Sequence, residues 1–167
     1  MEYLLASISG YLFGSIPTAY LLLKKIKGID ITKTGSGNVG AMNSYEVTNS
    51  KLTGIIVLVI DALKGFLSVF LITLLFPDQF GYPALALIFA VLSHCFNPWL
   101  NFKGGRGLAT AAGGAIFIFP FMLAAWLLLW AIIYIMKKDI LIANISATIL
   151  SLMVSFASGN IANKYSY

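Results

Sequence analysis

Long apolar stretches alternate with short polar segments along the whole chain. Residues 3–23, 52–76, 82–100 and 140–157 are each apolar over most of their length. A helix that crosses the hydrocarbon core of a bilayer needs about 20 predominantly apolar residues. The pattern therefore predicts an all-α polytopic membrane protein.

The apolar stretch 108–136 allows two interpretations. One helix of 29 residues would be about 43 Å long, and Pro120 interrupts it. Two short crossings, 108–119 and 120–136, are the alternative. If the first polar loop is inside, two crossings place nine of the eleven basic residues on the same side, as the positive-inside rule expects. We therefore expect about six transmembrane helices, with the N-terminus outside and the glycine-rich loops on the cytoplasmic face.

Composition supports the membrane interpretation. The chain is 59% hydrophobic and 10% charged, with a mean hydropathy of +0.90, whereas soluble domains carry about 25% charged residues. The net charge of +5 would suggest nucleic acid in a soluble protein, but here the basic loops indicate a cytoplasmic face near anionic lipid heads. No nucleic-acid partner is expected. A single cysteine, Cys95, excludes an intrachain disulfide and a multi-cysteine metal site, and no metal is expected.

A first glycine-rich loop, TGSGNVGAMN at residues 34–43, contains the spacing G-x-G-x-x-G. A dinucleotide site would need a strand before this motif and a βαβ unit around it, and neither is predicted here. Glycines still allow backbone N–H groups to approach an anion. Asn43 and Ser44 are expected to cap the helix that leads to the next span. The candidate phosphate-binding residues are Gly35, Ser36, Gly37, Asn38, Gly40 and Asn43. An ordinary flexible connector is the alternative.

A second glycine-rich segment, HCFNPWLNFKGGRGLAT at residues 94–110, ends one span and begins the next helix. Two cations beside exposed amides at a helix N-terminus are typical of an anion site. The candidate residues are Lys103, Gly104, Gly105, Arg106, Gly107 and Thr110. A positive-inside turn with helix-breaking glycines would show the same pattern.

Ionisable residues also lie within the predicted spans. Asp61 and Lys64 are three residues apart and share one helix face, and such residues usually mark a functional site. A structural ion pair that extends toward the interface is the alternative. His94 is the only histidine, and it is a candidate general base, phosphate donor or polar helix end. All these features lie at the predicted inner face, where a pocket would suit a substrate with a charged head and an apolar tail.

These motifs together resemble those of the bacterial acyl-phosphate:glycerol-3-phosphate acyltransferases. The matching strings are GSGNVGAMN at 35–43, DALKG at 61–65, HCF at 94–96 and FKGGRGLAT at 102–110. The resemblance implies a seven-span enzyme of the bacterial inner membrane whose active site faces the cytoplasm. It implies transfer of a fatty acyl group from acyl phosphate to the 1-hydroxyl of glycerol 3-phosphate, giving lysophosphatidic acid and phosphate without a cofactor.

The resemblance also suggests roles for individual residues. An acyl phosphate is already activated, so positioning and charge neutralisation can supply most of the catalysis. Ser36 and nearby amides would hold one phosphate, and Lys103 and Arg106 would stabilise the departing one. The proton acceptor would be His94 or, as we prefer, a substrate phosphate oxygen. The rival functions are a transporter or binding protein for a phosphate ester, and an inactive paralogue.

The chain departs from the family pattern in several places. Met42 replaces Thr, Asn97 stands where the family has Pro, Arg106 replaces Lys, and Glu46 lies near a position where the family has Arg.

The family's final helix and third motif are also missing from residues 1–167. We therefore expect that residues 1–167 form a single acyltransferase domain, which is either a fragment of a longer protein or an unusually short member of the family. Without that helix, Asn144 and Ser151 are expected to lack a neighbour.

Overall fold

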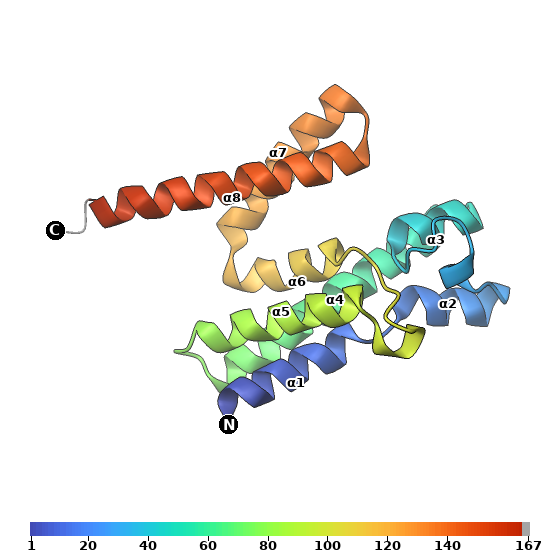
Figure 1. The fold of residues 1–167 in the computed structure, drawn as a ribbon, viewed down its shortest axis with the longest axis horizontal. Helices are drawn as coiled ribbons and strands as arrows, with labels where there is room; N and C mark the ends of the chain where they lie inside the picture. Colours follow the sequence, from blue (N-terminus) through green and yellow to red (C-terminus); the bar gives the residue numbers. More distant parts are fainter. Residues whose placement is uncertain (165–167) are drawn as a thin grey trace. The chain divides into compact units, whose positions relative to one another are not determined.

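The regular elements of the computed structural model, which describes residues 1–164, are all helical (Figure 1). The helices are α1 (Glu2–Gly14), α2 (Thr18–Lys27), α3 (Ala41–Thr48), α4 (Lys51–Leu75), α5 (Gly81–Cys95), α6 (Leu108–Ile118), α7 (Pro120–Lys137) and α8 (Ile140–Lys164), with 3₁₀ turns η1 (Ile31–Lys33) and η2 (Pro98–Leu100). The all-α prediction is confirmed.

Five helical segments within the described residues are long and apolar enough to cross a membrane. They are Glu2–Lys27, Lys51–Leu75, Gly81–Leu100, Pro120–Lys137 and Ile140–Ala157. The sixth expected crossing corresponds to α6, whose 11 residues span about 16 Å, which is less than the hydrocarbon core. The predicted interruption at Pro120 is confirmed, because Pro begins α7 and cannot continue a preceding helix. The double crossing of 108–136 stays a prediction.

The first predicted span is not one continuous helix. The helix α1 ends at Gly14 and α2 begins at Thr18, because Pro17 has no N–H for a helical hydrogen bond. The prediction of one continuous helix over 3–23 was therefore wrong at this point.

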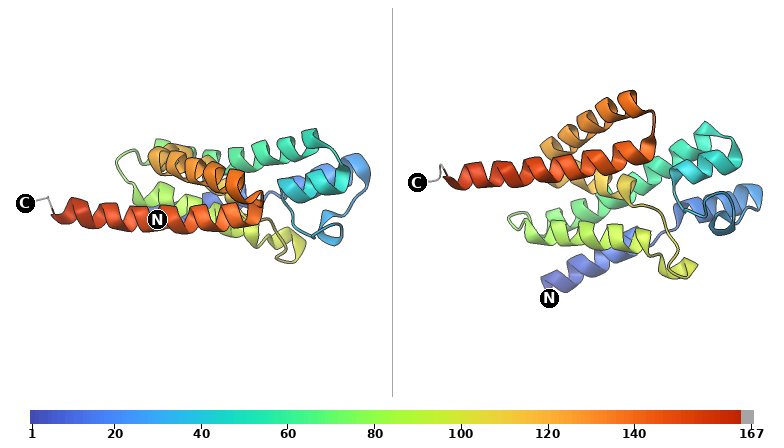
Figure 2. Two further views of the ribbon diagram at one scale, coloured as in Figure 1. Left: turned by 90° about the horizontal axis from the view of Figure 1, so that it is seen from above. Right: turned by 45° about the horizontal axis from the view of Figure 1, so that its top comes forward.

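The helices divide into two compact units, Met1–Ile118 and a second that begins at Phe119. In the first unit α1 packs along α5, and α4 packs along α5 and α6 (Figures 1 and 2). Small residues allow this close approach: a Cβ at Gly10 would overlap the Ala86 carbonyl, and one at Gly65 would overlap the Thr110 carbonyl. Such contacts are typical of helix packing in membranes. All candidate site residues lie in this unit.

The caps of α3 and α4 differ from the prediction. Gly40 is the N-cap of α3, and Asn43 and Ser44 lie inside that helix. The helix that forms the next span, α4, is capped by Ser50, whose hydroxyl accepts a hydrogen bond from Thr53 N at 3.3 Å. The expected capping by Asn43 and Ser44 was wrong because an extra helix, α3, precedes α4.

The second unit contains α7 and α8, which pack against each other. The indole Nε1 of Trp130 donates to Asn144 Oδ1 at 2.7 Å, and Ser151 Oγ donates to the Thr148 carbonyl at 3.0 Å. The prediction that Asn144 lacks a neighbour was therefore wrong, and for Ser151 it stays a prediction. An indole donor from the adjacent helix satisfies the amide, and the serine bonds to its own helix.

Candidate functional site

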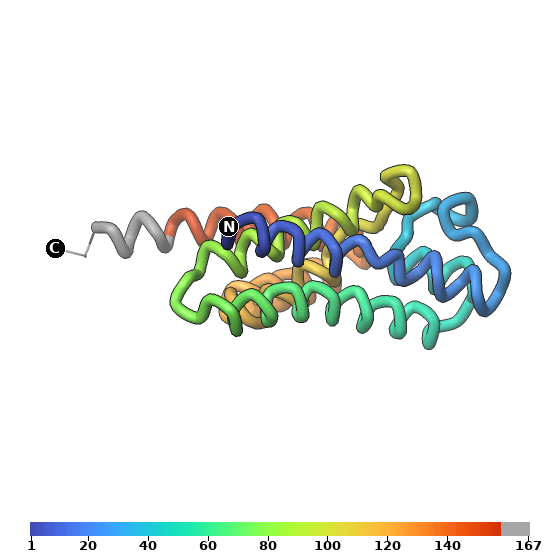
Figure 3. Tube along the Cα trace, turned by 90° about the horizontal axis from the view of Figure 1, so that it is seen from below, coloured from blue at the N-terminus to red at the C-terminus, as the bar shows by residue number. Residues whose placement is uncertain are grey.

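The two glycine-rich loops, residues 34–40 and 101–107, meet in the structure. The backbone N–H of Val39 donates to the Gly104 carbonyl at 3.1 Å. Both loops lie at the same end of the first unit (Figure 3). The expectation that the two motifs come together is confirmed.

The first loop is shaped by the side chain of Asn43. Its Oδ1 accepts from Ser36 N at 3.0 Å, and its Nδ2 donates to the carbonyls of Thr34 and Asn38 at 3.1 and 2.8 Å. Asn43 is only 2% exposed, so its amide group is fully occupied within the protein. Asn43 was predicted to bind phosphate, whereas its side chain organises the loop.

Most backbone donors of the first loop are also occupied. The amides of Ser36, Gly37, Asn38 and Val39 donate to Asn43 Oδ1, the Thr34 carbonyl, Ser36 Oγ and the Gly104 carbonyl. Gly35 and Gly37 adopt φ of +62° and +72°, which glycine tolerates best. The glycines therefore allow the turn. Among the described residues of this loop the amides of Gly35 and Gly40 donate no hydrogen bond, so their expected contact with phosphate stays a prediction. The exposed side chain of Ser36 stays a candidate.

Upstream of this loop, Asp30 fixes the entry into the turn. Its carboxylate accepts from Thr32 Oγ1 at 2.6 Å and from Thr32 N at 3.1 Å. These hydrogen bonds hold the pKa of the Asp30 carboxyl below its usual value, because they stabilise the ionised form. Asp30 was not among the predicted site residues, although an Asp two residues before a Thr is a recognisable turn signal.

The second loop folds back onto the end of α5. The N–H of Gly105 donates to the His94 carbonyl at 3.2 Å. A Cβ at Gly104 would overlap the carbonyls of His94 and Cys95, and a Cβ at Gly105 would overlap the His94 ring. Only glycine permits this approach, so the GG pair sets the position of the loop.

The same fold leaves donors available in the second loop. Within residues 1–164 the amides of Gly104, Arg106 and Gly107 donate no hydrogen bond. The side chains of Lys103 and Arg106 are exposed and make no hydrogen bond or ion pair with a described residue. Two cations and free amides at the start of α6 form an anion-binding arrangement.

His94 is enclosed. It is 6% exposed, its Nε2 lies under the backbone of Gly105, and its Nδ1 is 3.9 Å from Asp61 Oδ1. This burial leaves little of the ring open to a substrate, so of its three candidate roles the geometry favours a polar helix end.

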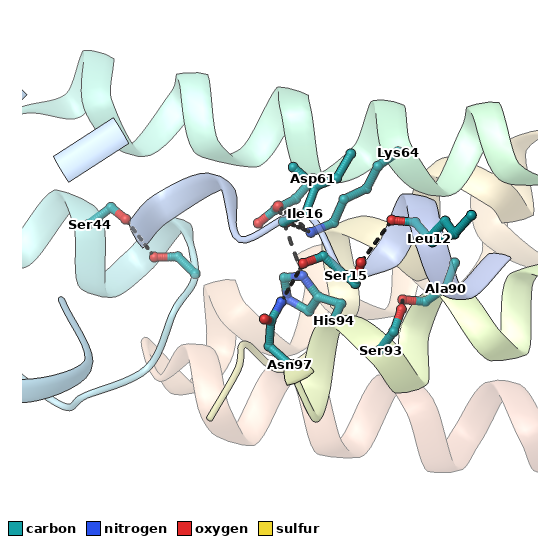
Figure 4. A network of polar contacts seen from close by, with 11 residues as sticks. Leu12, Ser15, Ile16, Ser44, Asp61, Lys64, Ala90, Ser93, His94 and Asn97 are labelled. Atoms are coloured by element: carbon teal, nitrogen blue, oxygen red, sulfur yellow. Dashed lines mark hydrogen bonds and ion pairs between the residues drawn. The ribbon is translucent and has the colours of Figure 1, made fainter. Parts of the chain in front are cut away.

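Asp61 and Lys64 form a buried ion pair, with Nζ and Oδ1 3.0 Å apart and side chains only 4% and 3% exposed for Lys64 and Asp61. Lys64 Nζ also donates to the Ile16 carbonyl at 2.9 Å (Figure 4). The pair is internal and does not extend to the interface. Its contact with substrate stays a prediction, and the geometry favours a supporting role.

Thr110 lies in the first turn of α6 and is fully buried. Its hydroxyl has no hydrogen-bond partner among the described residues. Its expected contact with phosphate stays a prediction. Among residues 1–164, no three His, Cys, Asp or Glu side chains lie together as a metal site would require.

Comparison with known proteins places these features in context. Residues 4–165 match a family model described as glycerol-3-phosphate acyltransferase. The glycerol-3-phosphate acyltransferase of Helicobacter acinonychis is 36% identical over 160 residues, covering 90% of this chain and 72% of the relative. Glycerol-3-phosphate acyltransferase 2 of Moorella thermoacetica is 40% identical over 148 residues, covering 87% of this chain and 73% of the relative.

Two crystal structures are also similar. Both are of PlsY, an integral membrane glycerol 3-phosphate acyltransferase. The glycerol 3-phosphate form has a TM-score of 0.83 at 33% identity, and the lysophosphatidic acid form has a TM-score of 0.80 at 34% identity. In each case the match covers 95% of this chain and 78% of the other.

Proposed function

Because this chain belongs to the glycerol-3-phosphate acyltransferase family, we propose that it transfers a fatty acyl group from an acyl phosphate to the 1-hydroxyl of glycerol 3-phosphate. The products are lysophosphatidic acid and inorganic phosphate. The observation that carries the proposal is the contact between the two glycine loops, which joins the segment of Ser36 to the segment of Lys103 and Arg106. These two cations are exposed and make no ion pair with a described residue.

Both substrates carry a phosphate group, and their charges repel each other. Lys103 and Arg106 offset that repulsion and stabilise the negative charge that develops on the departing phosphate. Hydrogen bonds to charged groups contribute about 1.5–3 kcal/mol each. Arg106 presents a planar fork that can bind two phosphate oxygens at once, whereas Lys103 acts as a point charge. The free amides of the second loop add donors beside them.

The acyl phosphate is a mixed anhydride, so the attacking hydroxyl needs orientation and a proton acceptor rather than a covalent nucleophile on the protein. We propose a phosphate oxygen of the substrate as that acceptor, since His94 is enclosed by Gly105. We propose that the site faces the cytoplasm of a bacterial inner membrane, because two crossings of 108–136 would place nine of the eleven basic residues on that side, as the positive-inside rule expects.

The test is phosphate release from palmitoyl phosphate by the purified chain in monoolein, with and without glycerol 3-phosphate. We expect release that requires the acceptor and one lysophosphatidic acid per phosphate. The control is a Lys103→Ala/Arg106→Ala variant, in which release should fall to background. Acceptor-independent release, or none, would contradict the proposal. Uptake of glycerol 3-phosphate into proteoliposomes without turnover would identify a transporter instead.

A further inference from the structure

The break between α1 and α2 leaves two carbonyl groups inside the first unit, and two distant side chains hold them. Asn97 Nδ2 donates to the Ser15 carbonyl at 2.7 Å, across 82 residues of sequence. Lys64 Nζ donates to the Ile16 carbonyl at 2.9 Å, across 48 residues. Figure 4 shows both contacts at the same bend of the chain. The break is therefore a fixed point to which α4 and the end of α5 are both attached.

Asn97 is also the centre of the turn that follows α5. Its Oδ1 accepts from Trp99 N at 3.1 Å. Its backbone carbonyl accepts from Leu100 N at 3.2 Å and from Phe102 N at 2.9 Å. Asn97 is only 2% exposed. One residue thus receives three of the amides in the segment that leads to Lys103.

That segment is conformationally strained. Asn101 and Phe102 are consecutive non-glycine residues with φ of +52° and +60°, a region that side chains with a Cβ seldom occupy. Such strain persists only where the surrounding structure over-determines it, and it is concentrated at functional sites. The strained pair directly precedes Lys103, so the direction in which this lysine leaves the turn depends on the bonds made by Asn97.

We propose that Asn97 is a positioning residue for the reaction: its bond to the Ser15 carbonyl anchors the turn 97–102 to the helix break and thereby fixes Lys103 for the phosphate groups. The proposal rests on the function proposed above.

The kinetic test uses Asn97→Ser. Serine keeps an oxygen that can cap Trp99 N but is too short to reach the Ser15 carbonyl. We expect kcat/KM to fall about tenfold, the factor that corresponds to about 1.4 kcal/mol. The matched control is Ser93→Ala, because Ser93 is equally buried and bonds only within its own helix, at 3.3 Å to the Ala90 carbonyl. That variant should retain wild-type kinetics.

A double-mutant cycle separates positioning from a general structural effect. If Asn97 acts through Lys103, Asn97→Ser should lower kcat/KM by no more than about twofold in a Lys103→Ala background, because residues that act as a unit are not additive. A further loss of about tenfold in that background, or an unchanged kcat/KM in the single variant, would overturn the proposal.

Alkylation of Cys95 gives a readout that does not depend on activity. Cys95 is the only cysteine and is half-buried. A Cβ placed on Gly107 would lie 3.0 Å from its Sγ, so the second loop covers part of the thiol. If Asn97→Ser makes the loop 101–107 open about tenfold more often, the alkylation rate of Cys95 should rise about tenfold. Ser93→Ala should leave that rate unchanged. An unchanged alkylation rate overturns the proposal. A raised rate in a chain with no turnover would refute the proposed function and retain the anchor.

If Asn97→Ser does not fold, Trp99→Phe tests the second side-chain bond that joins the turn 97–102 to the helix break. It removes only the bond from the indole Nε1 to Ser15 Oγ at 3.2 Å, at a side chain that is 68% exposed. We expect about a threefold rise in Cys95 alkylation, since a single neutral hydrogen bond is involved. No change in that variant would overturn the proposal.

Discussion

Replacing Lys64 by Met removes the ammonium group that lies 3.0 Å from the Asp61 carboxylate, at a place where both side chains are at most 4% exposed. Removing one partner of a buried ion pair leaves an uncompensated charge, which costs about 3–5 kcal/mol. The loss of the bond to the Ile16 carbonyl adds little, because that carbonyl also accepts from Thr18 N at 3.0 Å. For a chain of this size, about 2–4 °C per kcal/mol gives a fall in melting temperature of about 6–20 °C.

The double variant Asp61→Asn/Lys64→Met should be more stable than Lys64→Met alone. It removes both charges, and a buried pair can often be replaced by neutral groups with little loss. We expect the double variant to recover at least about half of the fall in melting temperature seen in Lys64→Met, since the uncompensated charge of Asp61 causes most of that fall. Leu63→Met is the control, because Leu63 lies on the same helix and is 48% exposed.

The assay is thermal unfolding in one detergent, followed with a thiol-reactive fluorogenic dye that reports exposure of Cys95, the only cysteine. Melting of Lys64→Met within about 2 °C of the wild type would mean a cost below about 1 kcal/mol and would refute the reasoning. The reasoning would also be refuted if the melting temperature of the double variant fell by the sum of the falls in Lys64→Met and Asp61→Asn, because the two charges would then act independently.

Three further predictions concern the site and the membrane topology. Lys103→Ala, Arg106→Ala and Ser36→Ala should each lower kcat/KM for phosphate release by at least about tenfold, a loss of about 1.4 kcal/mol; activity within twofold of the wild type would remove that residue from the site. Cys95→Ala should keep wild-type turnover in the same assay, because Cys95 has no role in the proposed chemistry; loss of turnover would show that it does. A cysteine at Lys138, in a Cys95→Ala background, should react only with reagents that reach the cytoplasm, and labelling from outside would exclude the double crossing of 108–136.

Much of the fold follows from the sequence, because a membrane span needs only a local run of apolar residues. The stretches 52–76 and 82–100 predicted α4 and the segment Gly81–Leu100 to within a few residues. Pro120 predicted the boundary between α6 and α7, because the missing N–H is a property of that one residue. The two glycine motifs likewise identified the loops that meet, since the steric freedom of glycine is local.

The tertiary structure decided which polar groups stay open to a substrate. The sequence presented Asn43, His94 and Lys64 as candidate substrate contacts, and packing encloses all three. It leaves Lys103 and Arg106 exposed. The partners responsible are set by the way the helices pack, and they come from other elements of the chain. A buried polar group must find a hydrogen-bond partner wherever the fold places one, and the residue's own neighbours in the sequence do not reveal which group that will be.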